Sequence, residues 1–536
     1  MITQVVDHLH YSCIEMRIQV QIIVNINKET NAGVTMNGRK FFIKSKNKAI
    51  KETIYEKTDS PITKDLKINE SHLYSLFDEA PDLKVHHIKL SGETNTVLTY
   101  LEGLADKRTI QLNIIRPLVT EMKSIDQLWS SNVIYSHLTY TFSWSEIEAA
   151  ILEGNSILFV DGEEKAIVID SQGWPQRSVE EPHSETMLKA SHEGFLETAS
   201  QNIALIRRFL PNRELKIKQY KIGERANIKI HLVYLGDVTN PTIIEELEKR
   251  INSFTVDTLL TTGELEQYIE DATFTPFPQS ILTERPDVTA MHVLEGRVAV
   301  IVDRSPRVLI TPVNFLSFFQ TIDDYSLRWS LALFVRLLRL LSFFIAVFLP
   351  ALYIVVIAFH YEVLPMNLIL SIGETRERVP VSPFLEAILM ELTLEMLREA
   401  GIRLPSTIGQ TVSIVGGIVI GQAAVQAGLV SNVMVIVVSL TAIASFIIPV
   451  FDMAYSIRLI RFPMMMIAWM FGMVGIAMGF MIILAHLITM ESMGTSYGTP
   501  LAPLKFSDWK DSVIRSPLRY LNKRQSGPRP IQRNKK

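Results

Sequence analysis

The run at residues 340–361 (LLSFFIAVFLPALYIVVIAFHY) constrains the fold more than any other feature, because it contains no Asp, Glu, Lys or Arg. A helix needs about 20 predominantly apolar residues to cross the hydrocarbon core of a bilayer. Pro350 lies near the middle of the run. A proline destabilises the interior of a soluble helix by about 3 kcal/mol, whereas a membrane helix tolerates one because neighbouring groups satisfy the freed carbonyl. The sequence therefore predicts an integral membrane protein with a large water-soluble part before this run.

Three further apolar runs follow, at residues 413–430, 432–450 and 464–488. Each is long enough, or nearly so, to span a bilayer. Four spans place both ends of the chain on one side, and the basic tail after residue 503, with Arg336 and Arg339, indicates that this side is cytoplasmic. Arg458 and Arg461 would then lie on the opposite side, against the positive-inside rule. We therefore expect four or five membrane segments.

Glycines recur within these runs at spacings that bring membrane helices close together. Either they mark tight helix packing, or they reflect only the general abundance of glycine in membrane helices. We favour tight packing, and the expected contact positions are Gly417, Gly421, Gly472, Gly475 and Gly479.

The segment at residues 383–401 (PFLEAILMELTLEMLREAG) predicts an amphipathic helix that Ser382 caps and Gly401 follows. Its apolar residues follow a helical spacing, and Glu391, Glu395 and Glu399 gather close together on the helix. The helix either lies at the membrane interface or faces a water-filled, cation-attracting cavity. The residue pattern alone leaves both readings open.

The part before the membrane reads as α/β, with helical and strand patterns alternating in two small lobes. We find no sequence repeat that relates the lobes, and we expect no signal peptide. The single cysteine, Cys13, cannot form an intrachain disulfide. The expected organisation is a flexible extension at 1–65, a first cytoplasmic α/β lobe at 66–174, a linker at 175–185, a second lobe at 186–330, a helical membrane domain at 331–490 and a basic cytoplasmic tail at 491–536.

Sequence patterns of catalysis are missing from the chain. No GxxxxGK[ST], HExxH, CxxC or GxSxG motif occurs, so we expect no enzyme, no cofactor and no metal site. The run at residues 293–306 (VLEGRVAVIVDRSP) has too few glycines to cradle a phosphate and predicts a hairpin. Asp323 and Asp324 could bind a metal, but an acidic pair at a helix N-terminus is the ordinary reading.

Several motifs occur in an order that resembles the A subunit of the GerA-type spore germinant receptors, over about residues 66–520. They are residues 202–210 (NIALIRRFL), 266–279 (EQYIEDATFTPFPQ), 283–287 (TERPD), 294–306 (LEGRVAVIVDRSP), 323–325 (DDY), 348–354 (FLPALYI) and 391–405 (ELTLEMLREAGIRLP).

This resemblance implies a receptor subunit in the inner spore membrane of an endospore former. Its expected partners are a transporter-like B subunit and a lipoprotein C subunit. It further implies a ring oligomer, expected to be a pentamer, that forms a ligand-gated channel for monovalent cations. Alternatives are a secondary transporter subunit, or a sporulation-specific paralogue that modulates such receptors.

If subunits form a ring, the helix at 383–401 is a natural pore lining, and Pro350 is a candidate hinge. The expected lining or gating residues are Leu385, Ile388, Leu389, Glu391, Leu392 and Glu395.

Overall fold

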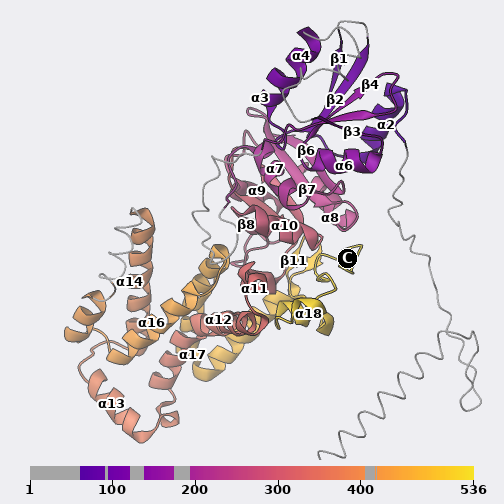
Figure 1. Cartoon of the computed structure of the whole chain (residues 1–536). Helices are drawn as coiled ribbons and strands as arrows, with labels where there is room; N and C mark the ends of the chain where they lie inside the picture. Colours follow the sequence, from indigo (N-terminus) through magenta and orange to yellow (C-terminus); the bar gives the residue numbers. More distant parts are fainter. Residues whose placement is uncertain are drawn as a thin grey trace, which may run out of the picture. The chain divides into compact units, whose positions relative to one another are not determined.

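The computed structural model describes residues 61–90, 94–120, 138–173, 193–404, 417 and 419–535 (Figure 1). All described residues belong to one compact unit of the chain, Asp59–Lys536. The linker expected at 175–185, and the extension expected at 1–65 except for its last five residues, lie outside the described residues.

The first lobe is an antiparallel five-stranded sheet with helical segments on both faces. The strand order is β1-β2-β4-β5-β3. All five residues of β4 are buried, as expected for a strand that is covered on both faces. The elements are α2 (Leu66–Leu76), β1 (Leu83–Lys89), β2 (Asn95–Leu101), α3 (Lys107–Thr109), η1 (Ile110–Ile115), α4 (Arg116–Thr120), β3 (Leu138–Thr141), α6 (Trp144–Leu152), β4 (Ser156–Val160) and β5 (Ala166–Ile169).

The second lobe is also an antiparallel five-stranded sheet, with strand order β6-β7-β9-β10-β8. Helices α8 and α9 pack on one face, and α7 and α10 on the other. The elements are α7 (Ala199–Phe209), β6 (Leu215–Ile222), β7 (Ile228–Leu235), α8 (Pro241–Ile251), α9 (Thr262–Ile269), β8 (Ile281–Thr283), α10 (Pro286–Leu294), β9 (Val298–Val302) and β10 (Val308–Thr311).

The two lobes share one topology, although we found no sequence repeat that relates them. Adding five to each strand number in the order of the first sheet gives the order of the second sheet. Helix α10 and strands β9 and β10 begin 142 residues after α6, β4 and β5 (286 against 144, 298 against 156, 308 against 166). Gly154 and Gly296, which follow the two helices, have φ of +91° and +89°. Residues 152–161 (LEGNSILFVD) and 294–303 (LEGRVAVIVD) are also identical at their first three and last two positions.

A buried ion pair joins the two lobes. Arg207 of α7 donates through Nη2 to Asp82 Oδ1 at 2.9 Å, and both side chains are at least nine-tenths buried. Beside it, Tyr234 Oη donates to Glu79 Oε2 at 2.6 Å. The lobes therefore make direct, specific contacts with each other.

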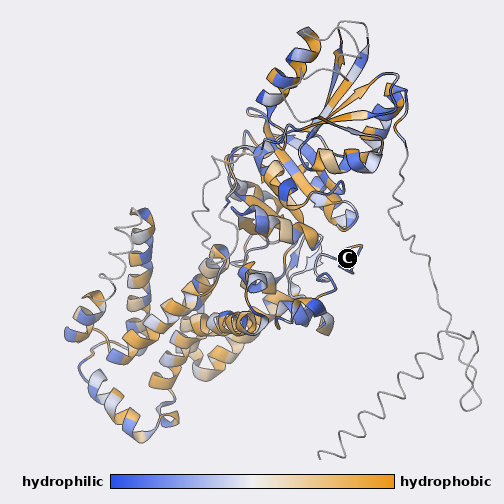
Figure 2. Ribbon diagram, viewed as in Figure 1, coloured by the Kyte–Doolittle hydropathy of each residue, from blue (hydrophilic) through white to orange (hydrophobic). Residues whose placement is uncertain are grey.

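The helical domain follows η2 (Phe315–Phe319) and α11 (Asp323–Ser326), and Figure 2 shows its long helices as largely hydrophobic. Of the described helices, α12 and α17 are long and apolar enough to cross a membrane, and α16 is a shorter apolar helix. Two such helices are fewer than the four or five membrane segments that we expected. The described part of the run at 413–430 is too short to be judged as a membrane-spanning helix. The domain contains α12 (Trp329–Ala358), η3 (Tyr361–Val363), α13 (Met366–Arg376), α14 (Pro383–Arg403), α16 (Asn432–Phe446) and α17 (Phe451–Thr489).

Helix α17 reverses direction at Gly472, whose φ of 58° and ψ of −139° are not helical. A Cβ at Gly479 would lie 2.5 Å from Met464 Cε, although the two residues are 15 positions apart in one helical stretch. A straight helix would separate them by about 22 Å. The stretch is therefore a helical hairpin, and Arg458 and Arg461 lie within its first arm and not in a loop.

The tail folds onto the second lobe and the start of α12. Its elements are β11 (Glu491–Ser492), β12 (Thr495–Ser496), α18 (Phe506–Ser512) and η4 (Leu518–Tyr520). Arg524 Nε donates to the carbonyl of Leu294 at 2.7 Å, and Ile531 N donates to the carbonyl of Val238 at 2.8 Å. The basic tail is thus structured and packs against the second lobe.

Candidate functional site

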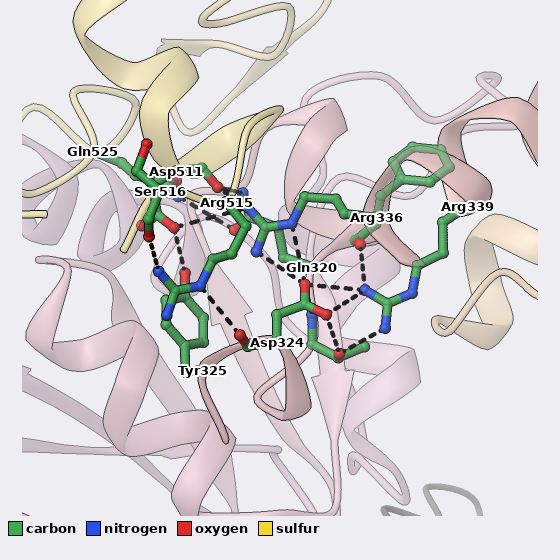
Figure 3. Close-up of polar contacts among 11 residues, drawn as sticks. Gln320, Asp324, Tyr325, Arg336, Arg339, Asp511, Arg515, Ser516 and Gln525 are labelled. Carbon is green, nitrogen blue, oxygen red and sulfur yellow. Dashed lines mark hydrogen bonds and ion pairs between the residues drawn. The ribbon is translucent and has the colours of Figure 1, made fainter. Parts of the chain in front are cut away.

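A buried ion network lies where the soluble part meets α12 (Figure 3). Asp324 of α11 is fully buried and accepts from Arg336 Nη2 at 2.9 Å and from Arg339 Nη1 at 2.8 Å. The two arginines are one helical turn apart, so both reach the same carboxylate. Arg339 Nη1 also donates to the carbonyl of Phe319 at 3.1 Å.

The tail completes this junction network. Arg336 donates to the carbonyl of Asp511, and Arg515 Nε donates to the carbonyl of Asp324 at 3.1 Å. Tyr325 Oη donates to Asp511 Oδ1 at 3.0 Å, and burial, with the Asp511 charge adding, raises the pKa of that phenol. Three separate segments of the chain thus converge on one buried site (Figure 3).

The sequence reading assigned these residues more ordinary roles. It took Asp324 as half of an acidic pair at a helix N-terminus, and Arg336 and Arg339 as flanking charges at the cytoplasmic face. The missed signal was the pair of arginines at i and i+3, which present two cations to one acceptor on the same face of the helix.

A second titratable group lies on α9. The carboxylate of Glu266 accepts a hydrogen bond from Ser280 Oγ. Burial, and then the charges of Asp452 at the start of α17 and of Glu270, raise the pKa of Glu266 to about 7, while the Ser280 hydrogen bond acts in the opposite direction. The Glu266 carboxyl therefore loses its proton near neutral pH. The charge of Asp452, in the α17 hairpin, contributes to this raised pKa and so couples the second lobe to the hairpin.

Helix α14 is held in the helical domain by ion pairs along one face. Glu391 is 1% exposed and its carboxylate binds the guanidinium of Arg461. One turn further, Glu395 Oε2 accepts from Arg458 Nη1 at 2.9 Å. Since α14 and the first arm of α17 are paired as Glu391 with Arg461 and Glu395 with Arg458, the two helices run antiparallel.

The other end of the same face is held by Glu386. Its Oε1 accepts from the backbone N–H of Ser431 at 2.5 Å and from Ser431 Oγ at 2.6 Å. Its Oε2 accepts from Arg376 Nη1 at 2.9 Å. The sequence reading did not select Glu386, because an isolated glutamate in an amphipathic helix carries no local mark of its partners.

The opposite face of α14 is apolar and open. Leu385, Leu389 and Leu392 are 55%, 49% and 48% exposed, and no described part of the chain covers them. Ile388 is half-buried and packs on the core of the helical domain. The expected lining residues therefore separate into two groups: the three leucines are exposed on the surface of the helical domain, and Glu391 is buried within it.

Pro350 is buried within an unbroken α12. Its missing N–H leaves the carbonyl of Ala346 without its helical donor. Arg461 Nε donates to that oxygen at 2.7 Å. The residue that neutralises Glu391 therefore also satisfies the carbonyl that the proline frees.

The expected packing glycines have different surroundings. A Cβ at Gly475 would collide with the carbonyl oxygen of Ile467, so the two arms of α17 approach closely there. A Cβ at Gly421 would make an ordinary contact 3.7 Å from Val435 Cγ1, and one at Gly417 would meet no described atom within 4 Å. Gly472 forms the turn itself. The described residues contain no group of three or more His, Cys, Asp or Glu side chains placed to hold a metal ion.

The chain is similar to a family of spore germination proteins. The family described as Bacillus/Clostridium GerA spore germination protein matches residues 71–527. Spore germination protein KA of Bacillus subtilis (strain 168) is 40% identical over 443 residues, which cover 81% of each chain. The protein named uncharacterized membrane protein YfkQ, of the same organism, is 39% identical over 479 residues, which cover 89% of this chain and 93% of that relative.

Among solved structures, one match is the crystal structure of the N-terminal domain of the A subunit of the Bacillus megaterium spore germinant receptor GerK3. It is 27% identical and covers 48% of this chain and 98% of that chain, with a TM-score of 0.39.

Proposed function

The chain belongs to the Bacillus/Clostridium GerA family of spore germination proteins, and from this premise we propose that it is the A subunit of a germinant receptor. The observation that carries the receptor role is the family match over residues 71–527. As such a subunit it works in the inner spore membrane with a transporter-like B subunit and a lipoprotein C subunit. The lobes and the tail then lie on the spore core side.

The helical domain, in this proposal, assembles with its copies into a ring, a pentamer, that conducts monovalent cations. The two-faced character of α14 supports this arrangement. Ion pairs fix its inner face to α17, while Leu385, Leu389 and Leu392 form an apolar face that the described chain leaves open. Copies around an axis would bring these leucines together, and an apolar constriction closes a pore by dewetting.

The carboxylates act differently from our expectation in this arrangement. Glu391 and Glu395 are bound by Arg461 and Arg458, so they position α14 and do not attract cations. The lining role falls to the leucines.

Gating requires a connection from the soluble part to the pore helix. The junction network anchors the first turns of α12 to α11 and to the tail. Further along α12, the carbonyl of Ala346 binds Arg461, which also binds Glu391 of α14. A bend of α12 at Pro350 would therefore be transmitted to α14 through a single guanidinium.

Ion flux through the purified full chain in liposomes tests the channel. Potassium or sodium should move down its own gradient without a second solute, and the flux should saturate only weakly. Flux that requires a co-transported solute gradient would instead identify a secondary transporter.

Deletion of the gene in its host tests the receptor role separately. Spores without the gene should lose the response to at least one germinant in a panel of amino acids, sugars and nucleosides. A full response to every germinant of the panel, in a strain that lacks other A subunits, would contradict the proposal.

A further inference from the structure

The folded tail contains a hollow of about 390 Å³ that is lined by four cationic side chains. Lys505 comes from the segment before α18, and Lys523, Arg524 and Arg533 come from the last stretch of the chain. Backbone hydrogen bonds pair this last stretch with itself: Arg524 N donates to the carbonyl of Arg533 at 2.7 Å. The cations are thus brought together by tertiary structure and not by a run in the sequence.

The hollow has a fixed polar floor. The buried carboxylate of Asp508 accepts from Ser526 N at 2.9 Å, from Ser526 Oγ at 2.5 Å and from Ser507 Oγ at 2.8 Å. Arg524 is oriented by the carbonyls of Leu294, Gln532 and Asn534 at 2.7–2.9 Å. Carbonyl groups orient a guanidinium but do not neutralise its charge, so Arg524 keeps a full positive charge at the wall.

The hollow carries more positive than negative charge, because four cationic side chains line it beside the single carboxylate of Asp508. In the described part of the chain, the side chains of Lys505, Lys523 and Arg533 make no ion pair with any acidic group. Glu295, the acidic residue behind this region, binds Lys535 Nζ at 2.5 Å and the N–H of Gln525 at 2.9 Å. Four cations therefore surround one hydrogen-bonded carboxylate, and a concave site of this charge concentrates anions.

Exposed apolar side chains flank the hollow. Leu504 and Phe506, next to Lys505, are 63% and 70% exposed. The carbonyl of Asp511 in α18 accepts a hydrogen bond from Arg336 at the start of α12. Under the proposed membrane orientation, this places basic and apolar groups together near the surface where anionic headgroups lie.

We propose that this hollow is a phosphate-binding site, which takes the phosphate group of an anionic lipid headgroup or of a soluble phosphate ester. Arg524 presents its Nη2 hydrogens, which none of the three carbonyls takes, and the three other cations supply charge-assisted hydrogen bonds to the remaining oxygens. The site does not depend on whether the assembled receptor conducts ions.

The test uses the full chain, purified in a non-ionic detergent, and measures binding by titration with three probes. The probes are dioctanoyl phosphatidylglycerol, dioctanoyl phosphatidylcholine and inorganic phosphate, all at one ionic strength. The site variant is Lys523→Gln with Arg533→Gln. The matched control, Lys510→Gln with Arg519→Gln, removes the same charge from exposed residues of the tail outside the hollow.

We expect the unaltered chain to bind phosphatidylglycerol or inorganic phosphate and to bind phosphatidylcholine much more weakly. The site variant should bind about tenfold more weakly, as expected for the loss of about 1.4 kcal/mol of charge-assisted bonding, and the control should change less than twofold. Preference for phosphatidylglycerol over phosphate identifies a headgroup site, and the reverse identifies a soluble ligand.

Two results would overturn the proposal: no binding of either anionic probe, or equal weakening by both charge variants. The thermal midpoint without probe should be unchanged in the site variant, because neither side chain has a described partner. Arg533→Lys, which keeps the charge, should retain binding.

Discussion

Arg461 donates its Nε–H to the carbonyl oxygen of Ala346 at 2.7 Å, and Ala346 is four residues before Pro350 in α12. This is the acceptor that loses its helical partner because proline has no N–H. The same guanidinium binds Glu391 of α14. The kink-prone helix, the hairpin and the helix with the open apolar face therefore meet at one side chain.

Arg461→Leu should strongly destabilise the helical domain. It leaves the buried Glu391 carboxylate and the Ala346 carbonyl without their partner, and loss of one member of a buried ion pair costs about 3–5 kcal/mol. The thermal midpoint of the full chain in detergent measures this loss. Arg403→Leu, which removes an exposed pair with Glu399, should cost less than about 1 kcal/mol.

Pro350→Ala tests whether the proline is the reason for the second bond of Arg461. Alanine returns an N–H to the Ala346 carbonyl, so Arg461→Leu should cost about 1 kcal/mol less in the Pro350→Ala background than alone. Equal losses in the two backgrounds would show that Pro350 and Arg461 are independent.

Leu389→Ala should open the proposed gate, because it removes apolar bulk from the open face of α14 and favours wetting. Dormant spores of this variant should leak potassium or germinate without germinant, as measured by potassium release at equal receptor abundance. Leu368→Ala, a change of similar exposure on α13, serves as the control. Normal dormancy together with a normal germinant response in Leu389→Ala would reject the gate.

Asp324→Asn should uncouple the soluble part from α12. The change leaves Arg339 buried without a described counter-charge and Arg336 with only the more distant Asp511 carboxylate at 3.8 Å, at a cost of about 3–5 kcal/mol. We expect a lower thermal midpoint and faster proteolysis near residue 324. Asp323→Asn, at a partly exposed neighbouring position, should have a much smaller effect. Identical proteolysis in the two variants would contradict the anchoring role of Asp324.

Glu266→Gln should make stability less dependent on pH. The folded pKa of Glu266 is raised to about 7 from 4.5, so its stabilising contribution is full below pH 4.5 and is lost as pH rises through 7. Glutamine stays neutral, and the variant should therefore exceed the unaltered chain at pH 8 by at most about 3 kcal/mol and match it near pH 4.5.

The thermal midpoint at several pH values measures this difference. Glu245→Gln, on the exposed side of α8, should show no such trend. A Glu266→Gln midpoint equal to that of the unaltered chain at pH 8 would disprove the linkage.

Much of the fold could be predicted because it depends on local pattern. Most of the apolar run at 340–361 lies in α12, and the part of the chain before it contains α/β structure, as its helical and strand patterns indicated. The duplication of the lobes was missed in the sequence, although residues 152–161 and 294–303 share Leu-Glu-Gly and Val-Asp at the same positions. The strand order that reveals it is formed by contacts between distant segments.

The candidate site was less predictable than the fold. The spacing of Glu391 and Glu395 left a membrane interface or a cavity open, and the position of Arg458 and Arg461 placed them on the far side. These four residues instead form two ion pairs, of which Glu391 with Arg461 is fully buried and Glu395 with Arg458 partly buried. The available signal was that the two glutamates, and likewise the two arginines, lie about one helical turn apart on two different apolar segments. That signal becomes decisive only when the two helices are known to be antiparallel neighbours.

Residue identity and local order were enough to predict the family, the positions of the apolar runs and the proline within the first of them. The partner of each buried charge, the reversal at Gly472 and the folding of the basic tail onto the second lobe depend on contacts between distant segments. A buried charge is stable only beside its counter-charge. The counter-charge of Arg207 lies 125 residues away and that of Arg461 lies 70 residues away, so the chain had to fold before these pairs existed.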